Sequence, residues 1–417
     1  MKLNSSKLIA KLTVLKYKVY HFSFNPIDHC KFLPSGKANN KLIIRMKRYF
    51  IFIFSIVLVL ELVISSCKRD LKLIVGSFTE GNEKGLSLFD FNERKGSLKL
   101  VSKTDAGPNP SFFCFSERHN LIYAINEVME FRGKPGGGIT TLKYDFETGL
   151  IEKQNEILVP YGGPCYISLS ADSGFLFVAN YASGSIAVVK LDKNGIPEYV
   201  SDSIKYETEK NVYSRAHMIK QDPSGKHVYV TDLGLDRIMI YDLDRNTGKL
   251  NLINNGMISL PNESGPRHFV FNADGSRMYV INELGSTIMV FKVDDNGQLE
   301  PFQTVPTIKK GFNESNSCAE ILIGKKGRFL YGSNRGENSI VVFKIARDGS
   351  LGLAGRVPCG GDWPRNFVID PSGRFLLVGN QKSGNISVFK ITLRTGISDG
   401  PLSKTEIKAP AFLGFVN

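Results

Sequence analysis

A pattern of about fifty residues recurs six times after residue 105, and it limits the folds that this chain can adopt. The clearest copy spans residues 265–291 and contains three apolar segments separated by an Asp274-Gly275-Ser276 turn and a short polar loop. A fourth apolar segment follows at residues 299–305. Aromatic and β-branched residues between Asp-Gly and Ser-Gly turns are typical of antiparallel strands. Four strands per repeat are what a β-propeller blade requires, and such blades must stack around a common axis to bury both faces.

The second strand of each repeat ends in an amide or carboxylate residue that marks the period. These positions lie 46 to 54 residues apart and are Asn126, Asn180, Asp232, Asn282, Asn334 and Asn380. A spacing in this range matches one four-stranded blade per repeat.

The segments outside the six repeats predict a seventh blade. Residues 71–78, 85–91 and 98–103 form three candidate strands without a leading one, and residues 409–416 form a single strand without followers. Insertion of the last strand beside the first three would close the ring and remove its open edges. We therefore expect an all-β, seven-bladed β-propeller closed by the C-terminal strand. The alternative, a six-bladed ring, leaves two apolar segments unpaired.

The N-terminal region has the organisation of a secretory signal. Met46-Lys47-Arg48 precedes an apolar run at residues 49–60, and Ile64-Ser65-Ser66 precedes Cys67. A basic start, a short apolar core and small residues at the cut are typical of signal peptides, and small residues directly before a cysteine resemble a lipobox. We expect residues 1–45 to be an over-extended start, 46–66 a lipoprotein signal peptide and 67–417 the propeller.

This reading predicts a protein of the cell envelope that touches the membrane only through a lipid on Cys67. The alternatives are an uncleaved anchor helix at the apolar run or, if the signal is not used, a cytoplasmic protein. Residues 1–66 carry eleven Lys and Arg and two Asp and Glu, which accounts for +9 of the net charge of +13. The charge therefore gives no support for a nucleic-acid partner. The remaining cysteines have no CxxC spacing, so no zinc site is expected.

Equivalent positions of different repeats should meet around the channel of a propeller, although they are far apart in sequence. Alignment on the turn glycines places Arg267 in register with His217, Ala319 and Arg365, and the next position holds His268, Glu320 and Asn366. Glu283 and Arg335 follow the period-marking residues of their own repeats. Trp363, just before Pro364, either lines the channel mouth or packs in a turn.

Two interpretations of these charged residues remain open. Packing alone requires no Arg or His at a channel, so an ion network of Arg267, Arg335 and Arg365 with Glu283 and Glu320 could simply close it. In the functional interpretation the arginines bind a carboxylate or phosphate through paired hydrogen bonds, and a histidine transfers protons near neutral pH. Both interpretations can hold together.

The ordered set of motifs resembles the seven-bladed propeller lactonases, a family that includes bacterial 6-phosphogluconolactonase and is similar to fungal carboxy-muconate cyclase. The resemblance covers residues 71–417. The motifs that carry it are Ala216-His217, Asp232-Leu233-Gly234-Leu235-Asp236, Gly265-Pro266-Arg267-His268, Asn282-Glu283, Cys318-Ala319-Glu320-Ile321, Ser333-Asn334-Arg335-Gly336 and Pro364-Arg365-Asn366-Phe367.

The resemblance implies hydrolysis of a lactone that carries an anionic group, without a metal or other cofactor. By the family pattern, His217 would act as general base, Arg267 and Arg335 as stabilisers of the anion and oxyanion, and Glu283 as orienter or proton donor. His268, Glu320 and Arg365 would bind substrate.

Two alternatives remain for the function: a cyclase that forms a lactone from a diene acid, and a non-catalytic surface propeller that binds protein or glycan. We also expect an Arg267→Ala change to lower turnover and to leave folding intact.

Overall fold

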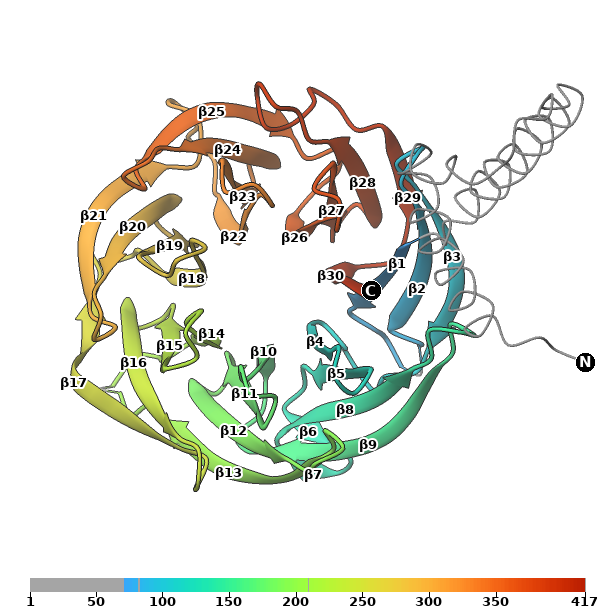
Figure 1. Cartoon of the computed structure of the whole chain (residues 1–417), viewed down its shortest axis with the longest axis vertical. Helices are drawn as coiled ribbons and strands as arrows, with labels where there is room; N and C mark the ends of the chain where they lie inside the picture. Colours follow the sequence, from blue (N-terminus) through green and yellow to red (C-terminus); the bar gives the residue numbers. More distant parts are fainter. Residues whose placement is uncertain (1–70, 82, 209, 417) are drawn as a thin grey trace, which may run out of the picture. The chain divides into compact units, whose positions relative to one another are not determined.

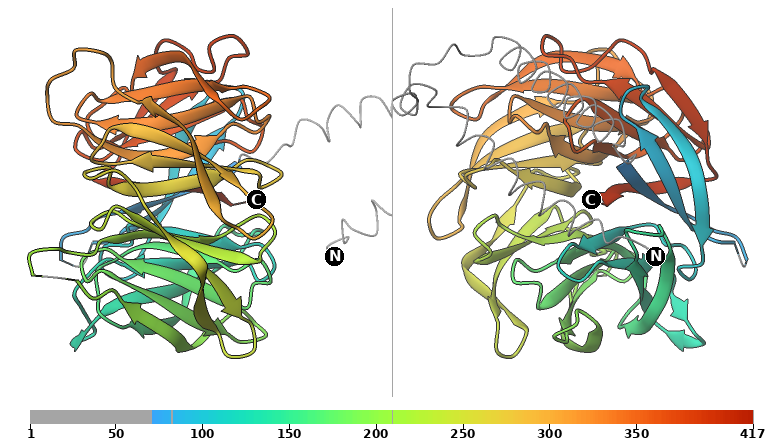
Figure 2. Two further views of the ribbon diagram at one scale, coloured as in Figure 1. Left: turned by 90° about the vertical axis from the view of Figure 1, so that its left-hand side faces the viewer. Right: turned by 45° about the vertical axis from the view of Figure 1, so that its right-hand side comes forward.

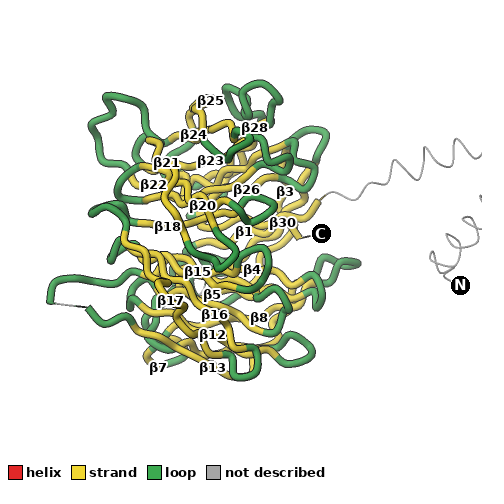
Figure 3. The backbone as a smooth tube through the Cα atoms, turned by 60° about the vertical axis from the view of Figure 1, so that its left-hand side comes forward, coloured by secondary structure: helices red, strands yellow, loops and turns green. Residues whose placement is uncertain are grey.

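The computed structural model describes residues 71–416 apart from residues 82 and 209, and this part of the chain is built of strands and loops alone (Figure 3). Within it there is no long apolar helix that could span a bilayer. The predictions for residues 1–45, for residues 46–66 and for Cys67 lie outside the described residues.

The described strands form seven four-stranded antiparallel sheets arranged as blades around a central channel (Figures 1 and 2). The first blade consists of β3 (Ser97–Thr104), β2 (Leu86–Asn92), β1 (Leu71–Ser77) and β30 (Pro410–Val416), from the rim inward. The second contains, from the channel outward, β4 (Phe113–Ser116), β5 (Leu121–Asn126), β8 (Gly137–Tyr144) and β9 (Ile151–Val159). A two-stranded hairpin of β6 (Glu130–Phe131) and β7 (Lys134–Pro135) extends the loop between β5 and β8.

The other five blades follow the same order from the channel outward. The third has β10 (Pro164–Leu169), β11 (Phe175–Asn180), β12 (Ser185–Leu191) and β13 (Pro197–Lys205). The fourth has β14 (Ala216–Gln221), β15 (His227–Asp232), β16 (Arg237–Asp244) and β17 (Lys249–Ser259). The fifth has β18 (Pro266–Phe271), β19 (Arg277–Asn282), β20 (Thr287–Val293) and β21 (Leu299–Pro306). The sixth has β22 (Ser317–Ile323), β23 (Phe329–Arg335), β24 (Ser339–Ile345) and β25 (Leu351–Pro358). The seventh has β26 (Pro364–Ile369), β27 (Phe375–Asn380), β28 (Asn385–Lys390) and β29 (Ser403–Glu406).

The C-terminal strand closes the ring as the sequence predicts. β30 pairs antiparallel with β1, with Lys72 opposite Val416 and Gly76 opposite Phe412. The first blade is thus completed by the end of the chain, and the six-bladed alternative is wrong. The pairing of β30 with β1 gives the first blade the same four strands as the other six blades of the described ring.

The residues that mark the repeats are buried, and five of the six bond to the loop that enters the blade. All six marker side chains are at most 1% exposed. The amide of Asn126 donates to the carbonyl of Ala106 at 2.7 Å, and the amide of Asn334 donates to that of Thr307 at 3.1 Å. Asp232 also bonds to its loop, but as an acceptor: its carboxylate accepts from the backbone N–H of Arg215 at 2.8 Å. Hydrogen bonds pair the buried amides of these markers, although Oδ1 of Asn180, Asn282 and Asn380 has no partner in the described part of the chain.

Adjacent blades are held together by apolar clusters and by a repeated hydrogen bond. A tyrosine in the second strand of one blade donates to a glycine carbonyl in the outer turn of the next blade. The four pairs, at 2.6 to 2.9 Å, are Tyr123–Gly195, Tyr229–Gly297, Tyr279–Gly349 and Tyr331–Gly396. All four tyrosines are fully buried, so their hydrogen bonds lie inside the packed interfaces between blades.

Candidate active site

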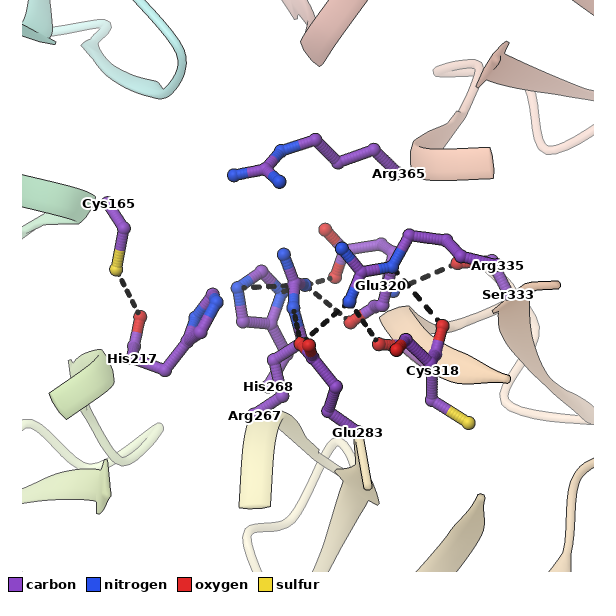
Figure 4. A network of polar contacts seen from close by, with 12 residues as sticks. Cys165, His217, Arg267, His268, Glu283, Cys318, Glu320, Ser333, Arg335 and Arg365 are labelled. Carbon is purple, nitrogen blue, oxygen red and sulfur yellow. Dashed lines mark hydrogen bonds and ion pairs between the residues drawn. The ribbon is translucent and has the colours of Figure 1, made fainter. Parts of the chain in front are cut away.

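Bulges in the innermost strands aim pairs of consecutive side chains into the channel. In β14, β18 and β26 the pairing register shifts so that His217, Arg267 and Arg365 are extra residues with no direct partner in the second strand. The innermost strands β10, β22 and β30 carry the same irregularity. Regular strands send alternate residues to opposite faces, whereas a bulge re-aims a side chain. Arg267 and His268 can therefore both meet the channel-side network (Figure 4).

One carboxylate joins two arginines from adjacent blades. Oε2 of Glu283 lies 3.0 Å from Nε of Arg267 and 2.7 Å from Nη2 of Arg335. Arg267 is 3% exposed and Arg335 5% exposed. Burial lowers the pKa of Arg267, and burial followed by the charge of Arg267 lowers the pKa of Arg335 to about 10. Arg335 thus stays cationic at neutral pH, and the charge of Glu283 raises the pKa of both guanidiniums against the effect of burial.

Backbone carbonyls fix the orientation of both guanidiniums. Nη1 of Arg267 donates to the carbonyl of Ala319 at 2.6 Å, and Nη2 of Arg335 donates to that of Cys318 at 2.9 Å. Nε of Arg267 is close to Glu283 but out of line for a hydrogen bond. In the described part of the chain, Nη2 of Arg267 and Nη1 of Arg335 have no protein acceptor. Each arginine therefore keeps one donor group for a ligand.

A second carboxylate holds the neighbouring histidine. Oε1 of Glu320 lies 3.1 Å from Nδ1 of His268, and its Oε2 accepts from the amide of Asn366 at 2.5 Å. Burial lowers the pKa of His268, although Glu320 opposes the shift. For Glu320, burial is the largest single influence and raises the pKa, but the charge and hydrogen bond of His268, the charge of Arg267 and the N–H of Ile321 together lower it, and the net shift is downward. Glu320 therefore orients His268 and Asn366 as a buried acceptor.

His217 is a buried imidazole without a hydrogen-bond partner for Nδ1. It is 5% exposed, and its ring packs edge-on against His268 at 5.0 Å and Tyr181 at 5.5 Å. Burial, and then the charges of Arg267 and the other channel cations, hold its pKa well below the usual value for histidine. His217 is thus neutral at physiological pH and has a lone pair or N–H that no described protein group uses.

Arg365 is the least constrained of the three channel arginines. Its side chain is 17% exposed, and the nearest carboxylate oxygen, Oε2 of Glu127, is 3.9 Å from Nη2. That oxygen already accepts a hydrogen bond from Ser111. The guanidinium lies 5.0 Å from the centre of the Phe78 ring, and Figure 4 shows it apart from the other bonded groups. Arg365 is therefore free to contact an anion.

Aromatic side chains from several blades meet one residue deeper along the inner strands. Phe112 contacts Phe412 at 3.8 Å, Tyr166 at 4.5 Å and His268 at 6.1 Å between ring centres. These residues come from the inner ends of four different blades, so the contacts cross the channel. They form an aromatic group that adjoins the charged network at His268.

The structure brings together the residues that the sequence predicts. His217, Arg267, Glu283 and Arg335 lie in one network with His268 and Glu320, and Arg365 lies beside them (Figure 4). Their catalytic and binding roles, and the open pocket expected around them, stay predictions. One expectation changes with this geometry: Arg267 is buried and bonded to the adjacent blade, so we now expect its removal to lower stability.

The sequence reasoning missed the aromatic partners of the two histidines. Tyr181 follows the marker Asn180 as Glu283 follows Asn282, and Tyr166 occupies the same repeat position as His268. Alignment of the repeats places both tyrosines at these positions, but the sequence-based prediction selected residues by charge, and tyrosine is neutral.

Among the described residues no group of three His, Cys, Asp or Glu side chains is placed to bind a metal.

Two surface cavities lie outside the bonded part of this network, although the second is lined by Phe78, whose ring Arg365 faces. One of about 330 Å³ lies over the outer strands of the second blade and is lined by Asn120, Lys143 and Phe146 among others. Another of about 260 Å³ is lined by Phe78, Lys103 and Lys408 among others. Neither contains a neutral histidine beside arginines, so chemistry favours the channel network.

Comparison with known proteins agrees with this architecture. A family model described as "Lactonase, 7-bladed beta-propeller" matches residues 72–413. The chain is 34% identical over 337 residues to a 6-phosphogluconolactonase of Formosa agariphila, covering 78% of this chain and 93% of that protein. A 6-phosphogluconolactonase of Bacillus subtilis is 28% identical over 331 residues, covering 77% and 91% of the two chains.

A solved structure extends the likeness to three dimensions. The periplasmic gluconolactonase of Pseudomonas aeruginosa superposes with a TM-score of 0.77 at 30% sequence identity, covering 83% of this chain and 99% of the other. The family model spans most of the described propeller, including every residue of the charged network. The chain therefore belongs to the seven-bladed β-propeller lactonase family.

Proposed function

We propose that the chain hydrolyses a sugar lactone that carries an anionic group. The observation that carries the proposal is the neutral, unpartnered imidazole of His217 beside three arginines that keep donors free. A closed ion network would leave neither a free base nor a free cation. Both are what an ester hydrolase requires.

His217 acts as the general base in this proposal. Its neutral imidazole accepts a proton from water as the water oxygen attacks the lactone carbonyl carbon. The C=O π electrons move to the carbonyl oxygen, which becomes an oxyanion. When the tetrahedral intermediate collapses, the ring C–O bond breaks, and the ring oxygen takes the proton back from His217. One lactone and one water thus give one hydroxy acid, which releases its own proton to solvent.

The arginines stabilise the negative charge that develops. Nη2 of Arg267 and Nη1 of Arg335 are the uncommitted donors on fixed guanidiniums, and Arg365 supplies a third cation. Fixed charge aimed at an oxyanion can lower a barrier by about 3–4 kcal/mol per donor. Glu283 is best suited to orient the two arginines, because one of its oxygens contacts both.

The names of the relatives support a sugar lactone and leave two versions of it. Two curated relatives are named 6-phosphogluconolactonase, whereas the structural relative is named a periplasmic gluconolactonase. A cationic network favours the substrate with an anionic substituent. The lipobox-like segment before Cys67 supports a second proposal, that the enzyme works at the cell envelope on a lipid anchor. Mass measurement of the mature N-terminus, with Cys67→Ser as control, tests the anchor.

The direct test is a lactonase assay of residues 67–417 on 6-phosphogluconolactone and on unphosphorylated gluconolactone. We expect turnover of at least one, and we expect His217→Gln to reduce kcat by about 100-fold or more, as loss of a general base does. A His119→Gln variant in the outer turn between β4 and β5 serves as the matched control. Turnover that is unchanged in His217→Gln, or absent on every lactone, contradicts the proposal.

The same assay distinguishes the alternatives. Formation of a lactone from a diene acid without lactone hydrolysis indicates a cyclase. Binding of a glycan or protein without any turnover indicates a surface module.

A further inference from the structure

Trp363 occupies a backbone position that other blades give to glycine, asparagine or alanine. Four of the innermost strands begin at a proline, and Pro110 precedes β4 by three residues. The residue before that proline has a positive φ in all five blades. These residues are Asn109, Gly163, Gly265, Trp363 and Ala409, with φ of 46°, 67°, 62°, 67° and 41°. Glycine adopts this region without strain, whereas a bulky residue there is an outlier. Trp363 is the only large side chain of the five.

Backbone contacts hold Trp363 in this conformation. Its N–H donates to Oδ1 of Asn338 at 2.9 Å, and its carbonyl accepts from the N–H of Gln381 at 2.9 Å. A strained residue persists when its surroundings fix it, and such residues cluster at binding sites. The reason for this strained conformation should therefore lie in a role of the Trp363 side chain.

Packing does not supply that reason. In the described part of the chain the indole belongs to none of the apolar clusters that join the blades. It is partly exposed, and two cations border it instead. Cζ of Arg335 is 5.4 Å from the ring centre, and Nζ of Lys382 is 3.3 Å from it.

The ammonium of Lys382 has the indole as its partner. Its side chain is exposed, and within residues 71–416 its ammonium makes no hydrogen bond or ion pair. The indole alone offsets its charge, through the attraction between a cation and an aromatic face. Arg335, the other cation at the ring, belongs to the catalytic network.

We propose that Trp363 and Lys382 form the subsite for the part of the substrate remote from the reacting carbonyl. The indole contacts the C–H face of a sugar, and the ammonium of Lys382 binds an anionic substituent such as a phosphate or carboxylate. The position of Arg335 beside the indole makes this subsite continuous with the catalytic residues. The inference rests on the proposed lactonase function and specifies which substrates that site prefers.

The test uses the fact that Trp363 is the sole tryptophan of the chain. Its fluorescence reports binding directly and needs no turnover. We expect 6-phosphogluconate to change the emission of the residue 67–417 protein saturably, and gluconate to do so only at concentrations about tenfold higher, because it lacks the remote anion. An equal response to both acids, or no response to either, overturns the subsite.

A pair of lysine variants tests the role of Lys382. Lys382→Met should raise the Kd for 6-phosphogluconate about tenfold and leave that for gluconate unchanged. Lys205→Met is the matched control, because Lys205 lies over Tyr161 at 5.6 Å in another blade. An equal effect of the two changes contradicts the assignment.

Substitution of the tryptophan separates a binding role from a structural one. Trp363→Gly places at this site the residue that two equivalent positions use, so the protein should fold with an undiminished Tm. KM for the anionic lactone should rise about tenfold while kcat changes little, and Trp363→Phe should restore part of the loss. An unchanged KM overturns the proposal. A fluorescence response without turnover of any lactone would instead retain the subsite and reject the lactonase function.

Discussion

At the scale of single residues, the site combines side chains held by hydrogen bonds or ion pairs with side chains whose polar atoms lack close partners. Glu283 and the carbonyls of Ala319 and Cys318 fix two guanidiniums, whereas Nδ1 of His217 and the guanidinium of Arg365 remain without close partners. Fixed charges act on a transition state without having to reorganise, and free groups can bind substrate or move protons. Each kind of residue predicts a different effect of mutation.

The pH dependence should show that His217 is neutral. The pKa of His217 is well below about 6.5. We therefore expect kcat/KM to stay constant as the pH falls through about 6.5, where a histidine of ordinary pKa would become protonated. The stability effect has the matching sign: the folded state binds fewer protons, so stability is full above about pH 6.5 and decreases as pH falls through the folded pKa. A pH series of kcat/KM, with denaturant unfolding at each pH, measures both. An acidic limb centred near pH 6.5 that His217→Gln removes would contradict this prediction.

Arg267 and Arg365 should separate stability from binding. Arg267→Ala breaks a buried ion pair and a hydrogen bond to the next blade, so we expect a loss of about 1–3 kcal/mol in unfolding free energy together with reduced turnover. Arg365→Met removes a 3.9 Å contact with Glu127 and the cation–π contact with Phe78, both partly exposed, and should change stability by less than about 0.5 kcal/mol while raising KM. Urea unfolding and steady-state kinetics on both variants check the contrast. Equal stability losses would show that Arg365 is structural.

At the scale of strands and blades, the repeat serves two purposes. Its second strand carries the buried marker and the tyrosine that bonds to the next blade, and its first strand carries the bulge that faces the channel. The structural residues therefore recur from blade to blade, while the channel residues differ. The sites of repetition and of variation in the sequence reflect this division.

Loss of one tyrosine hydroxyl should weaken one interface between adjacent blades. Tyr279 donates to the carbonyl of Gly349 at 2.9 Å, and burial raises its pKa to about 12, so it remains a donor well into alkaline conditions. Tyr279→Phe should lower the unfolding free energy by about 1–3 kcal/mol, because a buried carbonyl loses its donor. Tyr199→Phe, at an exposed tyrosine of β13, is the control and should have almost no effect. Chemical denaturation of the two variants decides the matter.

The blades could be predicted from the sequence, whereas the local backbone conformation could be predicted only in part. The period of the markers and the unpaired segments at residues 71–103 and 409–416 were sufficient for seven blades and the closure. Register alignment also identified the charged residues that meet at the channel. The bulges could not be predicted, because the extra residue lies inside an uninterrupted strand pattern. The strain at Trp363 was hidden as well, since nothing before Pro364 in the sequence specifies the sign of φ.

At the scale of the whole propeller, the ring depends on a single noncovalent joint between the two ends of the described chain. All other blades are continuous in sequence, but the first is completed only by β30. The inner face of β30 also supplies Phe412, which contacts Phe112 in the aromatic layer across the channel. Closure of the ring and completion of the channel are therefore one event.

Deletion of residues 409–417 should abolish the soluble monomer. It leaves the inner edge of β1 unpaired and removes Phe412 from the channel, and exposed edges favour aggregation. The control is a circular permutant opened in the loop between β13 and β14 and joined by a short linker from residue 416 to residue 71. Lys72 and Val416 lie opposite each other, so a tight linker suffices, and this variant should fold. Size-exclusion chromatography compares the two, and a monomeric deletion variant would show that closure is dispensable.

The bulges have a consequence for how this architecture acquires new chemistry. A bulged residue such as Arg365 has no direct partner across the ladder, so its replacement leaves the pairing of Pro364 with Asn380 and of Asn366 with Gly379 in place. Where the bulged side chain is not also bonded to the next blade, as Arg267 is, the chain can exchange what it presents to a ligand without changing the pairing that builds the ring. The six bulged inner strands each offer a pair of adjacent positions for such exchange. Cysteine, histidine, arginine and alanine already occupy the first of these positions in different blades, and substrate range in such proteins should therefore change faster than their shape.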